Sequence, residues 1–138
     1  MMRALLDTNV VLDHFLARQP FDIEALAIWR ANEQAHFTGY ISGITAVNLY
    51  YVARKEIGRV RARQAVAEVL AVMHVAPFDL AVLQAAHALQ WSDYEDAVQH
   101  ASATASGVEA IVTRNLNHYT SATIPVFSPA AFLAQLPQ

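Results

Sequence analysis

The fold is decided by the first segment of the chain, which reads RALLDTNVVLDHFL over residues 3–16. The apolar run that follows Arg3 stops at Asp7, as expected of a short buried strand. An apolar helical pattern then runs from Val10 to Leu16, and Asp7 is placed to cap that helix. A strand that passes directly into a helix predicts the opening unit of an α/β fold.

The rest of the chain continues this alternation. Further strands are expected at residues 36–41, 73–76, 110–112 and 124–127. Helices are expected at residues 22–35, from Ser42, at 59–72, from Asp79, from Asp93 to Gly107 and from Ser128. Strands separated by helices of this length predict a three-layer α/β/α sandwich with a mainly parallel central sheet. Its 138 residues are most simply one domain, residues 1–138.

The composition excludes several classes of protein. A hydrophobic share of 55% and a charged share of 15% indicate a buried core rather than disorder. Because there is no cysteine, disulfide scaffolds and cysteine-based zinc sites are excluded. The chain has no uninterrupted apolar run of membrane-spanning length and no secretory segment at its start. We therefore expect a cytoplasmic protein without membrane association.

The region around Gly58 combines a helix break with a concentration of positive charge. Gly58 is expected to end one helix and precede the next, in which Val60, Ala67, Leu70 and Val72 are expected to face the core. Five of the nine basic residues flank it: Arg54, Lys55, Arg59, Arg61 and Arg63. With a formal net charge of −3, any contact with nucleic acid must come from such a local window. A solvated face is the simpler interpretation, and RNA binding gains weight only if the acidic residues form a nuclease site.

Acidic residues from distant parts of the sequence are expected to meet at one edge of the sheet. Asp7 ends the first strand and Thr113 follows the strand at residues 110–112, and ligands of parallel sheets bind beyond the carboxyl ends of the strands. Asp93 and Asp96 are three residues apart on the first turn of a helix, so they point to roughly the same side. Crowded carboxylates raise one another's pKa unless a cation is present. The pattern predicts a site for Mg²⁺ or Mn²⁺, which could activate water towards a phosphodiester.

Each of these acids also has a structural interpretation. Asp93 is as consistent with a helix N-cap as with a metal ligand, whereas Asp96 gains only a dipole benefit from its position. Asp13 and Glu95 are interpreted as solvated surface, and Trp91 as a packing residue rather than a platform for stacking bases. The histidines show no paired ligand spacing.

Four segments of the chain together resemble one known family. They are residues 5–13 (LLDTNVVLD), 42–51 (SGITAVNLYY), 93–99 (DYEDAVQ) and 113–115 (TRN). In order and spacing these segments resemble the PIN domain, and within that family the toxin components of bacterial VapBC toxin–antitoxin pairs. The resemblance covers nearly the whole chain. It implies a ribonuclease that depends on Mg²⁺ or Mn²⁺.

The resemblance also implies roles for individual residues. Asp7 and Asp96 match the acids that hold the metal, and Asp93 is a third catalytic candidate in support. Thr8 and Thr113 are expected to orient the carboxylates, with Asn48, Asn115 and His118 as further supporting residues of the site.

This sequence departs from the family pattern at two places. The family commonly has Glu where this chain has Asn48, and an acid at or soon after the Thr-Arg-Asn triplet, where this chain has Asn115 and His118. Neutral amides can offer a carbonyl oxygen but no charge, so the affinity for the metal should fall. Imidazole suits Mn²⁺ better than Mg²⁺, which would shift the metal preference.

Two classes of function follow from the resemblance. The first is a metal-dependent endoribonuclease toxin, in which the basic window of residues 54–63 grips RNA phosphates. The second is a degenerate PIN domain that binds RNA or a protein partner without cutting, because neutral replacements leave too little charge to hold a metal. The resemblance further implies a cognate antitoxin as partner, and a homodimer.

Overall fold

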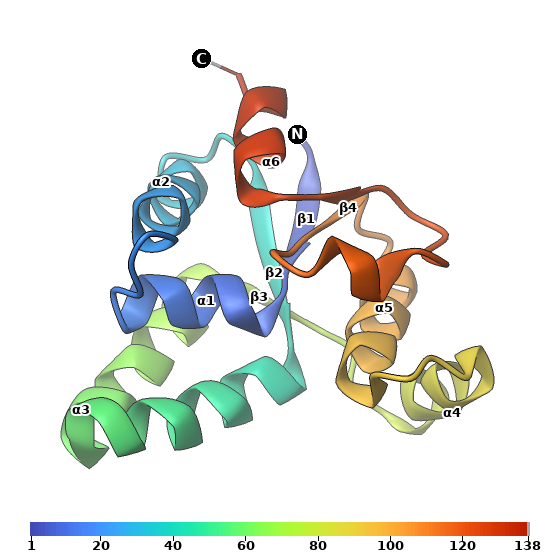
Figure 1. The fold of residues 1–138 in the computed structure, drawn as a ribbon, viewed down its shortest axis with the longest axis horizontal. Helices are drawn as coiled ribbons and strands as arrows, with labels where there is room; N and C mark the ends of the chain where they lie inside the picture. Colours follow the sequence, from blue (N-terminus) through green and yellow to red (C-terminus); the bar gives the residue numbers. More distant parts are fainter. Residues whose placement is uncertain (138) are drawn as a thin grey trace.

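Five parallel strands form the central layer of the structure, a computed structural model that describes residues 1–137 (Figure 1). In this part of the chain the strands are β1 (Arg3–Leu6), β2 (Thr38–Ser42), β3 (His74–Ala76), β4 (Ala110–Val112) and β5 (Val126–Phe127). Their order in the sheet is β3-β2-β1-β4-β5, and each neighbouring pair is parallel. The predicted sandwich with a parallel central sheet is confirmed, and the predicted strands are present with ends shifted by at most two residues.

Helices cover both faces of the sheet. Within residues 1–137 they are α1 (Thr8–Phe15), α2 (Asp22–Glu33), α3 (Gly43–Val72), α4 (Leu80–Leu89), α5 (Tyr94–Ser106), the 3-10 helix η1 (Leu116–Tyr119) and α6 (Pro129–Gln135). Figure 1 shows α1, α2 and α3 on one side of the sheet and α4 and α5 on the other. None of the helices in the described residues is long and apolar enough to cross a membrane.

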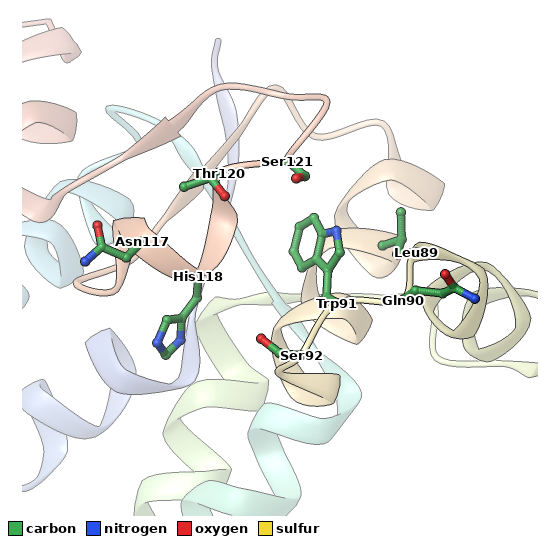
Figure 2. Close-up of a pocket in the computed structure, with 8 residues that line it drawn as sticks. All are labelled: Leu89, Gln90, Trp91, Ser92, Asn117, His118, Thr120 and Ser121. Atoms are coloured by element: carbon green, nitrogen blue, oxygen red, sulfur yellow. The ribbon is translucent and has the colours of Figure 1, made fainter.

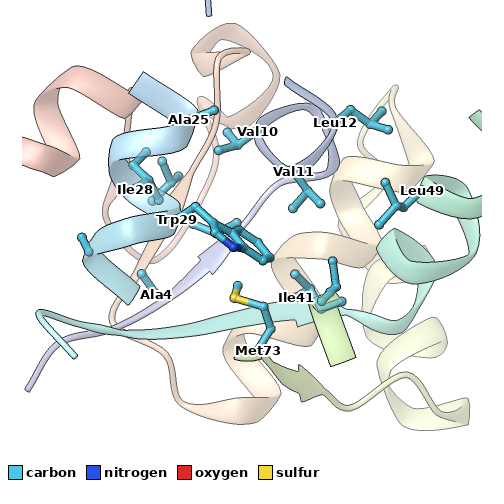
Figure 3. Packing of buried hydrophobic residues seen from close by; sticks show 14 of the residues in the cluster. Ala4, Val10, Val11, Leu12, Ala25, Ile28, Trp29, Ile41, Leu49 and Met73 are labelled. Carbon is cyan, nitrogen blue, oxygen red and sulfur yellow. The ribbon is translucent and has the colours of Figure 1, made fainter. Parts of the chain in front are cut away.

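The alternation of side chains along β1 divides the core into two parts. Ala4 and Leu6 belong to the larger cluster, under α1, α2 and α3, while Leu5 belongs to a second cluster under α5. In the larger cluster, Trp29 of α2 reaches over the sheet towards Met73 (Figure 3). Each fully buried side chain of the size of Leu5 stabilises the fold by roughly 1.5–3 kcal/mol. These two clusters fix the helices that carry the site on either side of the sheet.

The long helix α3 bends sharply at Gly58. This residue has φ 86° and ψ 165°, values that side chains with a Cβ rarely adopt. An added Cβ would meet no atom within 4 Å, so the backbone conformation rather than space requires glycine here. The expected helix break at Gly58 is therefore present.

The expected core face of the second arm of α3 is wrong except at Val72, which is partly buried against the larger core cluster. Val60 and Leu70 are 67% and 55% exposed, and the buried side chains of this arm are Ala62, Ala65 and Val69. Small alanine side chains let this arm approach the core closely, which a count of large apolar residues along the helix does not detect. The second arm consequently presents large apolar side chains to solvent.

Candidate functional site

The carboxyl ends of β1 and β4 meet where the strand order reverses, which is where parallel α/β sheets bind ligands. Leu6 and Val112 are paired in the sheet, so the residues that follow them, Asp7 and Thr113, lie side by side. The Thr113 hydroxyl donates to Asp7 Oδ2 at 2.7 Å. The structure thus brings together two residues that are far apart in the sequence.

Several donors surround the buried carboxylate of Asp7. The backbone N–H of Thr8 donates to Oδ1 at 2.7 Å, which makes Asp7 the N-cap of α1. The amide of Asn9 donates to Oδ2 at 3.2 Å, and the hydroxyl of Tyr119 lies 3.3 Å from the same oxygen. Hydrogen bonds of this kind hold a carboxylate in one orientation.

The first turn of α5 brings a second group of acids to the same edge. Asp93 is the N-cap of α5, because its Oδ1 accepts from the backbone N–H of Asp96 at 3.0 Å. The carboxylate of Asp96 is buried; its Oδ2 lies 2.8 Å from Nδ1 of His118, and its Oδ1 lies 3.3 Å from the Tyr119 hydroxyl. Asp93 Oδ2 lies 3.9 Å from the same imidazole nitrogen. The capping role of Asp93 is therefore real, and it leaves the second oxygen facing His118.

Tyr119 links the two groups of acids, and the sequence did not predict it. Its buried hydroxyl lies between Asp7 and Asp96 and can donate its proton to only one carboxylate at a time. Burial, with the charges of Asp7 and Asp96, raises the pKa of Tyr119 far above its usual range, so the hydroxyl remains a donor. Both Tyr119 and His118 lie on η1, a single turn without the apolar period of a longer helix.

The acids at this edge are electrostatically strained. The pKa of Asp7 is raised from its ordinary value of 3.8 to about 6; burial is the main cause and the charge of Asp96 contributes, while the hydrogen bond from Thr113 opposes the shift. Burial also raises the pKa of Asp96, and Asp93 adds to that effect against the hydrogen bond from His118. A bound cation would relieve this repulsion.

The donor atoms fit a divalent metal ion. Asp93, Asp96 and His118 each offer one ligand atom, and these atoms all lie within 4.8 Å of one another. Two carboxylate oxygens and one imidazole nitrogen form a mixed donor set, which suits Mn²⁺ and other first-row ions better than Mg²⁺. Asp7 and Asp96 also line one hollow of about 210 Å³.

The three other polar residues expected to support the site differ in their placement. Thr8 orients Asp7 through its backbone N–H, while its hydroxyl lies 2.9 Å from that of Thr45 and accepts from Gln99 at 3.0 Å. Asn115 is exposed at the rim of the hollow, and its backbone N–H donates to the Thr113 hydroxyl at 3.0 Å. Asn48 is half-buried on α3 and, within residues 1–137, is not among the residues that line this hollow.

The structure also corrects the interpretation of Asp13 as solvated surface. Asp13 is 1% exposed and accepts from Arg114 Nε at 2.6 Å and Nη2 at 3.2 Å. The Arg114 guanidinium also lies 3.8 Å from the centre of the Phe21 ring. The backbone N–H of Arg114 donates to Asn9 Oδ1. A charged residue between Leu12 and Phe15 in an apolar helix was the signal that Asp13 has a buried partner.

The basic window lies apart from the acids in the sequence and on the surface. Its five side chains, those of Arg54, Lys55, Arg59, Arg61 and Arg63, are exposed around the bend of α3. Within the described residues, they do not line the acidic hollow. Any contact that they make with RNA would therefore lie along the strand, away from the acids.

One comparison with known proteins identifies the family. The model of the PIN domain family matches residues 3–117. A search of curated proteins finds no match.

Several solved structures with the same fold are described as toxins or toxin–antitoxin complexes. A toxin–antitoxin complex from Klebsiella pneumoniae contains a chain that is 27% identical, with a TM-score of 0.68 over 91% of this chain and 97% of that one. VapBC from Salmonella typhimurium, solved bound to DNA, is 20% identical, with a TM-score of 0.72 over 94% of this chain and 99% of that one. VapC20 of Mycobacterium tuberculosis, a toxin that cleaves the sarcin–ricin loop, is 15% identical, with a TM-score of 0.65 over 78% of this chain and 86% of that one.

Proposed function

Because the chain belongs to the PIN domain family, we propose that it is a metal-dependent endoribonuclease and the toxin of a VapBC-like toxin–antitoxin pair. It would hydrolyse phosphodiester bonds of RNA in the cytoplasm, with residues 1–138 acting as one domain. The observation that carries the proposal is the approach of Asp7 and Asp96 to one Tyr119 hydroxyl, although the three residues come from three separate parts of the chain.

The residues at the sheet edge have separate tasks in this proposal. Asp7 and Asp96 would hold Mg²⁺ or Mn²⁺, with Asp93 and His118 as further donors. A divalent cation bound there supplies Lewis-acid chemistry, since it lowers the pKa of water and offsets the negative charge of a phosphodiester. The hydroxyl of Thr113 holds the Asp7 carboxylate in place, which keeps the acids aligned while substrate binds.

RNA is the substrate that a protein of the same fold and the basic window favour. A protein with the same fold, VapC20, cleaves the sarcin–ricin loop. The exposed basic window of residues 54–63 offers contacts to phosphates, which a protein with a net charge of −3 otherwise lacks.

A protein partner is the second part of the proposal. Similar structures include toxin–antitoxin complexes, and we propose that a small antitoxin neutralises this chain and that the chain forms a homodimer. The exposed apolar side chains of α3, among them Tyr51, Val60 and Leu70, supply surface for such contacts.

A degenerate PIN domain that binds without cutting is the second candidate. It is favoured by Asn48, a neutral residue at a position where the family commonly has an acid. Asn48 is half-buried and lies outside the acidic hollow. His118, which contacts Asp96 where the family commonly has an acid, likewise adds no negative charge to the site.

One experiment separates the two candidates. Purified wild-type protein and the Asp96→Asn variant are incubated with total RNA and either Mn²⁺ or Mg²⁺. We expect metal-dependent fragments from the wild type alone. Binding of RNA by both proteins without fragments, with either metal, would favour the degenerate domain.

A further inference from the structure

A second hollow lies against the acidic one. Its volume is about 340 Å³, within the size range of ligand sites, and it lies between η1 and the connection from α4 to α5 (Figure 2). It is lined by Leu89, Gln90, Trp91, Ser92, Asn117, His118, Thr120 and Ser121. His118 lines this hollow and contacts Asp96, which lines the acidic one, so the two hollows adjoin at the contact between these two side chains.

Trp91 forms a fixed aromatic surface in this hollow. Its indole meets the Tyr119 ring edge-on, with ring centres 5.6 Å apart. The centre of the His100 imidazole lies 4.9 Å from that of the indole. His100 is itself held, because its Nε2 accepts from the backbone N–H of Thr123 at 3.0 Å. One side of the indole is therefore packed, as the sequence predicted, while the residue is only partly buried and also lines the hollow.

The chemistry of the lining favours an uncharged, flat ligand with polar edges. Among the eight lining residues there is no lysine, arginine, aspartate or glutamate. Exposed hydroxyl groups of Ser92, Thr120 and Ser121 lie around the indole, and the amide of Asn117 lies farther away, beyond His118 (Figure 2). Such groups both donate and accept hydrogen bonds, as the edge of a nucleobase requires.

We propose that this hollow binds an unpaired base of the RNA, stacked on Trp91, next to the phosphodiester at the acids. The proposal rests on the proposed function, since it assigns a base to the same substrate. Single-stranded nucleic acids are commonly held by stacking bases on aromatic side chains while their phosphates are bound nearby. In this arrangement the Trp91 hollow selects where along a single strand the acids act, and the basic window adds affinity without selecting the position.

The fluorescence of Trp91 gives a direct test that requires no cleavage. The chain has two tryptophans, and the other, Trp29, is buried in the larger core cluster, so Trp29→Phe leaves Trp91 as the single reporter. This variant is titrated in EDTA with hexa-adenylate and with an abasic ribose-phosphate hexamer of the same charge. We expect saturable quenching by hexa-adenylate alone. Equal quenching by both hexamers, or by neither, would overturn the proposal.

Substitutions at Trp91 provide the second measurement and do not depend on the reporter. Affinity for fluorescein-labelled hexa-adenylate is measured by anisotropy in EDTA, and urea unfolding checks that each variant is folded. Trp91→Leu should weaken binding on the order of tenfold, because the base no longer stacks, whereas Trp91→Phe should retain most of the affinity. If Trp91→Leu folds poorly, Trp91→Phe and Trp91→His, which keep an aromatic ring, are compared with Trp91→Met.

The outcomes distinguish this proposal from the proposed function. Quenching and weaker binding in Trp91→Leu, without metal-dependent cleavage by the wild type, would support the base site and contradict the nuclease. Metal-dependent cleavage together with unchanged affinity in a folded Trp91→Leu would contradict the base site and leave the nuclease standing.

Discussion

Nδ1 of His118 lies 2.8 Å from Oδ2 of Asp96, although the two residues are 22 positions apart in the sequence. This contact places an imidazole among carboxylates, where the family commonly has an acid. Oxygen-only donor sets suit Mg²⁺, whereas imidazole suits Mn²⁺ and other first-row ions. We therefore expect His118 to shift the preference of the site from Mg²⁺ towards Mn²⁺.

Replacing this imidazole should change the metal preference. In His118→Asp we expect the ratio of Mn²⁺ affinity to Mg²⁺ affinity to fall on the order of tenfold, as measured by calorimetry with each metal. His74→Asp, which changes an exposed histidine on β3, serves as the control. An unchanged ratio in His118→Asp would show that the imidazole is not a ligand.

The carboxyl of Asp7 should make the metal-free protein less stable as the pH rises. Its pKa is raised to about 6 in the folded protein, so the folded state holds this proton more tightly than the unfolded chain does. The protonated Asp7 carboxyl thus stabilises the folded state near pH 4, and this stabilisation is lost as the pH rises through about 6. The loss in the free energy of unfolding is about 3 kcal/mol at most.

The variant Asp7→Asn tests this linkage. In EDTA its free energy of unfolding should depend less on pH between about 4 and 7 than that of the wild type, and at pH 7 the variant should be at least as stable. The measurement is urea unfolding at a series of pH values. A steeper pH dependence in Asp7→Asn than in the wild type would show that another group controls the stability in this range.

The buried pair of Arg114 and Asp13 should be important for stability. Arg114→Ala leaves the Asp13 carboxylate buried without its partner, which we expect to cost about 3–5 kcal/mol. The matched control is Arg18→Ala, because Arg18 pairs with Glu56 at 3.4 Å on a more exposed surface and should lose less than about 1 kcal/mol. Equal losses in urea unfolding would mean that the Arg114 pair is no more than a surface contact.

The sequence predicted the sheet and the meeting of Asp7 with Thr113 because both follow from local patterns. A parallel sheet brings the ends of its strands to one edge whatever the side chains do later. Asp93 was likewise predicted as an N-cap from its place before a helical pattern, and it is one.

The partners within the site could not be predicted in this way. Tyr119 and His118 reach the acids from a single turn of 3-10 helix that follows β4, and nothing in their local sequence specifies that position. The pairing of Asp13 with Arg114 also depends on a contact across 101 residues. Such contacts are determined by how the layers pack, which a local pattern does not contain.

The basic window should contribute affinity for RNA without sequence preference. Arg59→Ala and Arg63→Ala are each expected to weaken binding of single-stranded RNA and to reduce the slope of log affinity against log salt by about 0.7 for each phosphate that is no longer bound. Arg30→Ala, on the exposed side of α2, is the control. If the slope is the same in all three variants and the wild type, the window is only a solvated face.

The metal site is the central claim, and calorimetric titration with Mn²⁺ tests it most directly. The wild type and Asp96→Asn are titrated at neutral pH, above the raised pKa of Asp7 of about 6, so that the metal does not have to displace a proton from most of the Asp7 carboxyls. We predict saturable binding to the wild type and its loss in Asp96→Asn. Negligible heat from both proteins at millimolar Mn²⁺, or equal binding to both, would contradict the metal site and with it the nuclease.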